Sequence, residues 1–264
     1  MKIINVHTHI IKKPAEYGRD GKITDLIKDM KIGGVSKSLI ISLWDHTSDI
    51  DYSLKELFEI AKDERFGIIY TLNADKNLKS QLKDAEEYFK KRLIKGIKIL
   101  LGYQQIMPDD SKLYPFYKLC VKYNYPVIFH AGDTLGSRAK LVYSHPLNID
   151  SLAVDMPELK IIIAHLGNPW ILDAAEVIYK NANVYGDVSG LFLDFQIKDP
   201  RYYRFMAGKV NGLIAYAGGS KLLFGTDFPL MNSTDYIKFV KSLNLTAEEL
   251  ELIFYKNAEK LFRF

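Results

Sequence analysis

The sequence has little of what disulfide-bonded, membrane or fibrous proteins need. Its 264 residues include one cysteine, Cys120, which excludes a disulfide bond within the chain and agrees with a reducing compartment. No apolar run approaches the roughly 18 residues of a membrane-spanning helix, and MKIINVHTHI becomes polar too early for a signal peptide. The 17 Gly and 9 Pro form no biased tract. We therefore expect a globular, cytoplasmic protein without a membrane partner.

The charge balance gives no sign of a nucleic-acid partner. Lys and Arg number 36 against 32 Asp and Glu, a formal net charge of +4, and the lysines are interleaved with acids in stretches such as DLIKDMK. Such interleaving is typical of solvated helix faces rather than of a basic stripe that binds nucleic acid. Because 48% of the residues are hydrophobic, the chain can bury a sizeable core.

Eight short apolar runs are separated by stretches with helical periodicity, which indicates alternating strands and helices. The runs span residues 3–9, 38–43, 67–72, 95–101, 126–132, 160–167, 183–189 and 222–228. Strands that are apolar on both faces favour a parallel sheet. No linker-like stretch divides the chain, so we expect an α/β fold with one domain over residues 1–264. The first run ends in His7-Thr8-His9 rather than in a Gly-rich turn, so we expect a closed (β/α)8 TIM barrel rather than an open doubly wound sheet, with a last helix from about Ala247 to Phe262.

Five polar residues stand at the ends of predicted strands: His7, His9, His130, His165 and Asp227. In a barrel the carboxyl ends of the strands converge on one mouth, where active sites of this fold are built. Burying four imidazoles and a carboxylate there without an ion would be costly, and a divalent cation removes most of that cost. The donors suit Zn²⁺ and also Fe²⁺, Mn²⁺ or Ni²⁺. We expect one divalent transition metal ion per chain, with zinc as the first choice.

The sequence resembles the amidohydrolase superfamily, and within it the amidohydrolase-2 group that includes aminocarboxymuconate semialdehyde decarboxylase-like enzymes. The resemblance runs nearly end to end through VHTH, GIKI, FHAGD, SHPLNIDSLAVDMPELKIIIAHLGNPW, NVYGDVSG, LLFGTDFP and ELIFYKNAEKLF. It implies that His7, His9, His130 and Asp227 bind the metal, and that His165 is a catalytic residue or an additional ligand. In such chemistry Asp227 accepts or orients the proton of the attacking water, while His165 polarises the scissile carbonyl or stabilises the oxyanion.

Three further residues are candidates for substrate binding. Lys98 stands on the predicted fourth strand, where some branches of the superfamily carry a carboxylated lysine between two metals. We expect instead an ion pair or an ammonium group that faces the substrate. Arg138 follows the fifth strand and suits a substrate carboxylate, with a surface arginine as the alternative. Trp44 follows the second strand at the same mouth.

Two reaction classes fit such a metal site. Hydrolysis of a small ester, lactone or amide uses an activated water, whereas nonoxidative decarboxylation acts on a small unsaturated or aromatic carboxylic acid. We favour hydrolysis because the segment 10–21 is short for a decarboxylase of this family, although it contains Lys12, Lys13 and Arg19.

Other functions remain as alternatives. A nuclease of the same superfamily is disfavoured, because GIKIL offers a lysine where such enzymes carry an acidic motif on the fourth strand. A barrel that binds a small molecule without catalysis is the non-enzymatic alternative. We expect a small-molecule substrate as the partner. A homodimer is compatible with the resemblance, and the aromatic segment RYYRF (201–205) could serve as its interface or cover the barrel.

Overall fold

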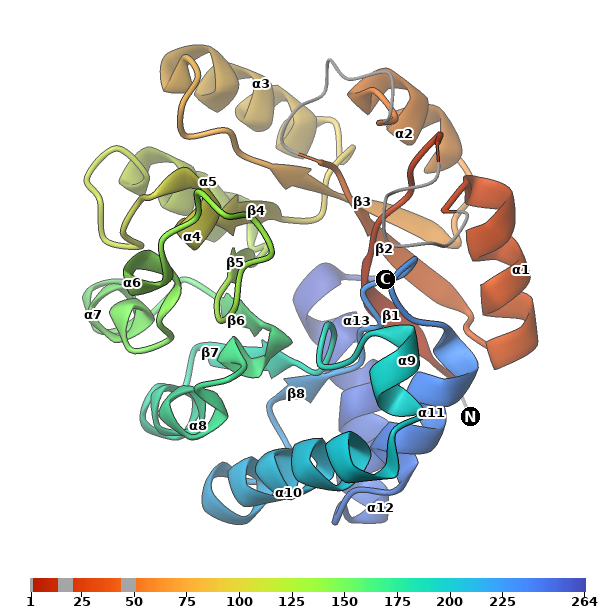
Figure 1. Cartoon of the computed structure of the whole chain (residues 1–264). Helices are drawn as coiled ribbons and strands as arrows, with labels where there is room; N and C mark the ends of the chain where they lie inside the picture. The colour runs from red at the N-terminus through yellow and green to blue at the C-terminus, as the bar shows by residue number, and fades with distance from the viewer. Residues whose placement is uncertain (1, 14–20, 44–50) are drawn as a thin grey trace.

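Eight parallel strands form the barrel that the sequence predicts (Figure 1). The structure is a computed structural model, and it describes residues 2–13, 21–43 and 51–264. The strands follow one another around the sheet in chain order: β1 (Ile4–Thr8), β2 (Lys37–Ile41), β3 (Phe66–Thr71), β4 (Ile97–Leu100), β5 (Val127–His130), β6 (Ile161–Ala164), β7 (Val184–Asp187) and β8 (Leu222–Leu223). Each strand overlaps one of the eight predicted apolar runs, so the fold class is confirmed.

Helices surround the strands and connect them (Figure 1). The longer ones are α1 (Ile23–Gly33), α2 (Leu54–Ile60), α3 (Leu78–Lys90), α5 (Tyr114–Tyr123), α7 (Asn148–Asp155), α8 (Ile171–Lys180), α10 (Pro200–Ala217) and α11 (Ser233–Lys241). Shorter ones are α4 (Leu101–Gln104), α6 (Leu141–Ser144), α9 (Asp194–Ile197), α12 (Ala247–Glu251) and α13 (Asn257–Phe262). The predicted last helix is present as α12 and α13, joined by a π-helical turn at Leu252–Lys256. In the described residues, no helix combines the length and the apolar character needed to cross a membrane.

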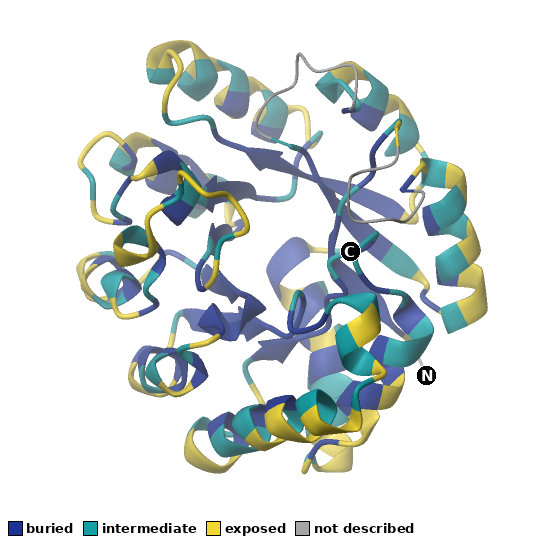
Figure 2. Ribbon diagram, in the orientation of Figure 1, coloured by how far each residue is buried: buried dark blue, intermediate teal, exposed yellow. Residues whose placement is uncertain are grey.

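The core has an inner and an outer part, and the strands are buried on both faces (Figure 2). The inner part fills the barrel with side chains such as Ile128, Ile162 and Leu223, against which Leu261 and Phe262 of α13 pack. Each fully buried side chain of this size contributes about 1.5–3 kcal/mol to folding. Lys95, just before β4, donates to the Phe262 carbonyl over 3.1 Å, so α13 covers the amino ends of the strands. The carboxyl ends of the strands, at the opposite end of the barrel, remain open for a functional site.

Polar side chains form the next layer along the same inner face. Because side chains alternate between faces with a period of two, the strand positions two residues beyond the inner apolar ones face inward again. His130 follows Ile128 in this way, and Asp187 follows Tyr185. The inner face therefore changes from apolar to polar toward the carboxyl ends of the strands.

The first strand departs from this alternation. Ile4 and Val6 lie in the inner core, so a regular strand would turn His7 outward. The pairing register of β1 with β2 shifts between Asn5 and Thr8, and His7 faces the interior. Such irregularities redirect side chains next to active sites. This local shift places both His7 and His9 at the mouth.

Hydrogen bonds between β1 and the segment after β8 complete the barrel. Val6 N donates to Phe224 O over 2.9 Å, Asp227 N to His7 O over 2.9 Å, and His9 N to Phe228 O over 2.7 Å. The buried Asn5 amide adds a bond of 2.8 Å to Thr226 Oγ1. These contacts bring Asp227 beside the two histidines of β1.

Candidate functional site

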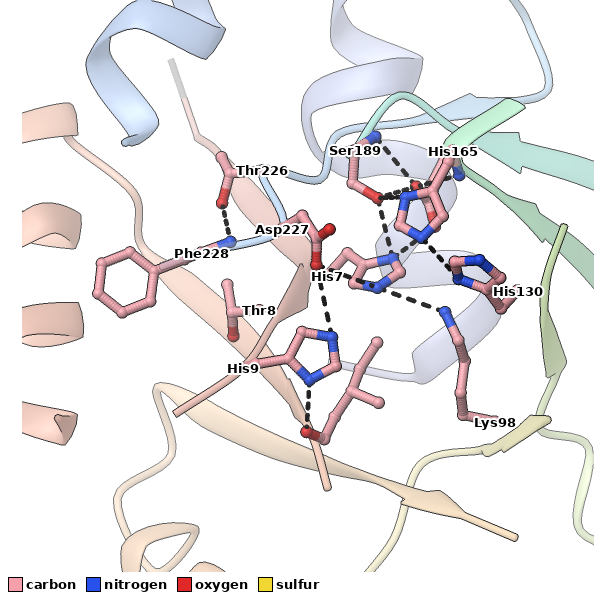
Figure 3. A network of polar contacts seen from close by, with 12 residues as sticks. His7, Thr8, His9, Lys98, His130, His165, Ser189, Thr226, Asp227 and Phe228 are labelled. Carbon is pink, nitrogen blue, oxygen red and sulfur yellow. Dashed lines mark hydrogen bonds and ion pairs between the residues drawn. The ribbon is translucent and has the colours of Figure 1, made fainter. Parts of the chain in front are cut away.

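A cavity of about 480 Å³ opens at the carboxyl ends of the strands. Its polar centre consists of six residues that the sequence singles out: His7, His9, Lys98, His130, His165 and Asp227. Figure 3 shows these side chains converging from different strands. The walls are mainly apolar or aromatic and include Leu100, Leu135, Leu191, Phe192, Tyr103 and Tyr202. The cavity therefore offers one reactive polar end and an apolar surround, as small-molecule sites commonly do.

In three histidines of the polar centre, one ring nitrogen forms a hydrogen bond with an oxygen atom that can only accept. The acceptors are Asp187 Oδ2 for His7 Nδ1 (2.9 Å), Ile41 O for His9 Nδ1 (3.1 Å) and Asp133 O for His130 Nε2 (2.8 Å). These partners assign the proton to the bonded nitrogen, because neutral imidazole carries one N–H. The opposite nitrogen of each ring then turns a lone pair toward the cavity.

The spacing of these donors fits a metal ion. Asp227 Oδ1 lies 3.4 Å from His9 Nε2 and 3.7 Å from His7 Nε2. Zinc bonds of about 2.0–2.1 Å in a tetrahedron place ligand atoms about 3.3–3.4 Å apart. His7, His9 and Asp227 thus form a close donor group, and a cation would stabilise the lone pairs and the carboxylate that meet there. The donor chemistry and the spacing therefore both fit a divalent transition metal.

A second group of close donors consists of His7, His165 and Asp187. The Ser189 hydroxyl lies among them, 3.0 Å from His7 Nδ1 and 2.9 Å from His165 Nδ1, and it donates to Asp187 Oδ1. A hydrogen-bonded hydroxyl already satisfies these atoms. This group is therefore a support beneath the polar centre.

Burial keeps the histidines of the polar centre neutral. It lowers the pKa of His9 to about 3 and that of His130 to about 4, with the Lys98 charge acting in the same direction. Burial also lowers the pKa of His7 and of His165 well below the usual value. Neutral imidazoles are the form that binds metals.

Asp227 and Lys98 affect each other in the same small volume. Burial raises the pKa of Asp227, and the Lys98 charge partly opposes this. Burial lowers the pKa of Lys98, against the attraction of Asp187 and Asp227. Each shift favours the uncharged form, because the cavity solvates charge poorly.

Lys98 is only 1% exposed, and its ammonium group lies inside the cavity. Nζ donates to His7 Nε2 over 3.3 Å, which agrees with a lone pair at that nitrogen. The expected ion pair is not found, since no carboxylate in the described part of the chain lies within 4 Å of Nζ. The orientation agrees with an ammonium group that faces the substrate.

Arg138 does not join the polar centre in the structure. Arg138 is exposed, does not line the cavity, and accepts a hydrogen bond from Gln105 Nε2 (3.1 Å) at its backbone carbonyl. The exposed position agrees with the alternative of a surface arginine, and the substrate role of Arg138 stays a prediction. Trp44 lies outside the described residues, as does Arg19.

Sequence reasoning missed Asp187 and Ser189. Both are 0% exposed and contact histidines of the polar centre. A signal was present, because Asp187 ends a strand as His130 does.

The backbone is strained at two residues of the polar centre. His165 and Asp227 both have φ near 58°, in the left-handed region that few residues other than glycine adopt. Such strain costs of order 1 kcal/mol or more and gathers at functional sites, where the surrounding structure holds it. Hydrogen bonds hold both backbones here, from His165 N to Asp187 and from Asp227 N to His7.

The fold and the site define a (β/α)8-barrel protein with a metal-type donor cluster at its catalytic mouth. The family model described as Amidohydrolase matches residues 57–264, and the chain belongs to this family. It is therefore an enzyme of the amidohydrolase family. A search of curated proteins finds no match.

Solved structures with the same fold catalyse more than one reaction. A probable 2-pyrone-4,6-dicarboxylic acid hydrolase from Acinetobacter baumannii is 17% identical, with 100% of both chains covered and a TM-score of 0.69. A 5-carboxyvanillate decarboxylase from Sphingomonas paucimobilis is 14% identical, with 100% of this chain and 99% of that chain covered and a TM-score of 0.73. An amidohydrolase from Burkholderia multivorans with bound zinc is 15% identical, with 100% of both chains covered and a TM-score of 0.74. At these identities the likeness shows the fold.

Proposed function

We propose that this enzyme is a metal-dependent hydrolase that cleaves a small ester, lactone or amide. One observation carries the proposal: ligand atoms of His7, His9 and Asp227 lie within 4.8 Å of one another at the polar end of a largely apolar cavity, which His130 also lines. One divalent ion per chain, with zinc as the first choice, would be held by these four residues. The bound zinc of the Burkholderia structure supports that choice.

The cation would supply Lewis acidity, which lowers the pKa of water from about 15.7 to near 7 and polarises a carbonyl oxygen. Asp227 then accepts the proton of the attacking water at a carboxylate oxygen and later delivers it to the leaving group. The apolar walls bind the body of the substrate and exclude water from the polar centre.

The side-chain charges of the cavity, taken without the proposed ion, include more carboxylates than cations and so support a neutral substrate. Among the described residues that line it, the side-chain carboxylates belong to Asp51, Asp133 and Asp227, and Lys98 supplies the ammonium group. A decarboxylase must bind a substrate carboxylate. Lys12, one of the cations considered for that role, forms an ion pair of 2.9 Å with Glu56.

The experiment measures turnover by zinc-loaded protein on neutral aryl esters, lactones and amides and on carboxylated aromatics. Ester hydrolysis releases a proton at pH 7.5, whereas decarboxylation releases CO₂ and takes up a proton. We expect ester or lactone hydrolysis that falls at least about a hundredfold in Asp227→Asn. CO₂ release from an aromatic acid would select decarboxylation, and no turnover on either panel would contradict the proposal.

A further inference from the structure

Asp187 and Ser189 form a fully buried pair beneath the polar centre, at the end of β7. Asp187 receives four hydrogen-bond donors: His7 Nδ1 at 2.9 Å, the backbone N–H groups of His165 and Ser189 at 3.2 and 3.0 Å, and the Ser189 hydroxyl. Figure 3 shows the Ser189 hydroxyl in contact with both His7 and His165. The pair thus connects a proposed metal ligand to the histidine beside it.

The protons around Ser189 can be counted. A serine hydroxyl has one hydrogen and two acceptor lone pairs. The hydrogen goes to Asp187 Oδ1, so the oxygen accepts from His165 Nδ1 (2.9 Å) and shares the N–H of His7 Nδ1 (3.0 Å) with Asp187 Oδ2. Both rings therefore carry N–H at Nδ1. Because both rings are neutral, their Nε2 atoms have lone pairs.

The neighbour of His7 Nε2 agrees with this assignment, whereas the neighbour of His165 Nε2 requires a cation near the two rings. Lys98 Nζ donates to His7 Nε2 over 3.3 Å. His165 Nε2 lies 3.2 Å from His130 Nδ1, whose own N–H is assigned to the other side of its ring, toward the Asp133 carbonyl. Two lone pairs face each other there, an arrangement that a cation in the polar centre would stabilise.

We propose that Asp187 and Ser189 are positioning residues that fix His7 and His165 in the Nδ1–H tautomer. His165 then presents an acceptor nitrogen to the cavity, so in its neutral form it takes a proton rather than donating one to an oxyanion. The consequence for metal affinity rests on the proposed function, whereas the tautomers themselves do not. Hydrogen-bond partners of metal-binding histidines typically change metal affinity by about 10–100-fold when removed.

The test uses full-length protein labelled with ¹⁵N-histidine, whose six histidines can be assigned by single substitutions. Long-range ¹H–¹⁵N correlation spectra of the zinc-free protein report which ring nitrogen carries the proton. We expect Nδ1–H at His7 and His165. Ser189→Ala should shift His165 toward the Nε2–H tautomer. Asp187→Asn should shift His7 toward its own Nε2–H tautomer. Ser144→Ala removes another buried hydroxyl, which donates to Gly132 O over 2.7 Å, and should change neither.

Zinc affinity, measured by competition with a chromophoric chelator, is the second readout. We expect a loss of about 10–100-fold in Asp187→Asn and no loss in Ser144→Ala. An Nε2–H tautomer of His165 in the unsubstituted protein would overturn the proposal, as would unchanged spectra in both Asp187→Asn and Ser189→Ala. If neither the unsubstituted protein nor any variant binds zinc, the proposed metal-dependent function is wrong. The tautomers measured by NMR then still test the positioning role of Asp187 and Ser189.

Discussion

The His9 imidazole and the Asp227 carboxylate lie 3.4 Å apart, although they come from opposite ends of the sequence. The hydrogen bonds that join β1 to the segment after β8 create this proximity. Barrel closure and site assembly are therefore the same structural event. The site cannot form in a partly folded chain whose first and last strands are separate.

Replacing Lys98 with Met should tighten zinc binding. The ammonium group competes for the His7 Nε2 lone pair at 3.3 Å and repels a divalent cation. We expect a gain of about tenfold or more, which corresponds to about 1.4 kcal/mol. The measurement is competition with a chelator.

Lys95→Met is the matched control for that variant. Lys95 is partly buried, whereas Lys98 is fully buried, and it donates to Phe262 O at the far end of the barrel, so its loss should leave zinc affinity unchanged. Loss of metal in Lys98→Met would contradict the account and indicate a carboxylated lysine that binds metal.

Gly190→Ala should damage both stability and activity. A Cβ there would lie 2.3 Å from His165 Nδ1, and the backbone has φ of +62°, which L residues rarely adopt. We expect a loss of about 2–4 kcal/mol in the free energy of unfolding, measured by urea titration, together with a lower kcat/KM.

Gly208→Ala provides the opposite case. Gly208 lies in α10, and a Cβ there would meet no atom within 4 Å. This change should stabilise the protein by about 0.5–1 kcal/mol, because alanine is the better helix former. A Gly190→Ala protein as stable as the unsubstituted one would show that His165 is not held as described.

Asp133→Asn should relax discrimination against anionic substrates. Asp133 lines the cavity, where its carboxylate would repel an anionic substrate. Removing this charge should raise kcat/KM for an anionic ester relative to its neutral analogue by about threefold to tenfold. Glu158→Gln, an exposed acid just before β6 at the other end of the barrel, should leave the ratio unchanged. An unchanged ratio in Asp133→Asn would remove Asp133 from substrate selection.

Much of the fold and the site could be predicted because the relevant signals are local. An apolar run that ends in histidine or aspartate predicts both a strand and the position of its carboxyl end, as at His130. Parallel strands in a barrel bring those ends together at one mouth. The register shift in β1 could not be predicted, since periodicity carries no information on how two strands pair.

The sequence does not show which residues are neighbours in space, and for this reason the roles of Asp187 and Ser189 were missed and the exposed position of Arg138 was not foreseen. Asp187 and Ser189 matter because of the histidines they contact across the barrel, and NVYGDVS alone specifies no neighbours. Arg138 follows a strand in the sequence, yet its turn leads to the surface. Position after a strand predicts which loops lie at the mouth, and not which side chains enter the cavity.

Metal content per chain tests the central claim most directly. Protein purified without added metal, and again after reconstitution with zinc, is analysed by plasma mass spectrometry alongside His7→Ala/His9→Ala. His145→Ala is the control, because His145 is not among the residues that line the cavity. The account predicts about one transition metal ion per chain, lost in the double variant and kept in the control. No bound metal after reconstitution, or equal binding by the double variant, would contradict it.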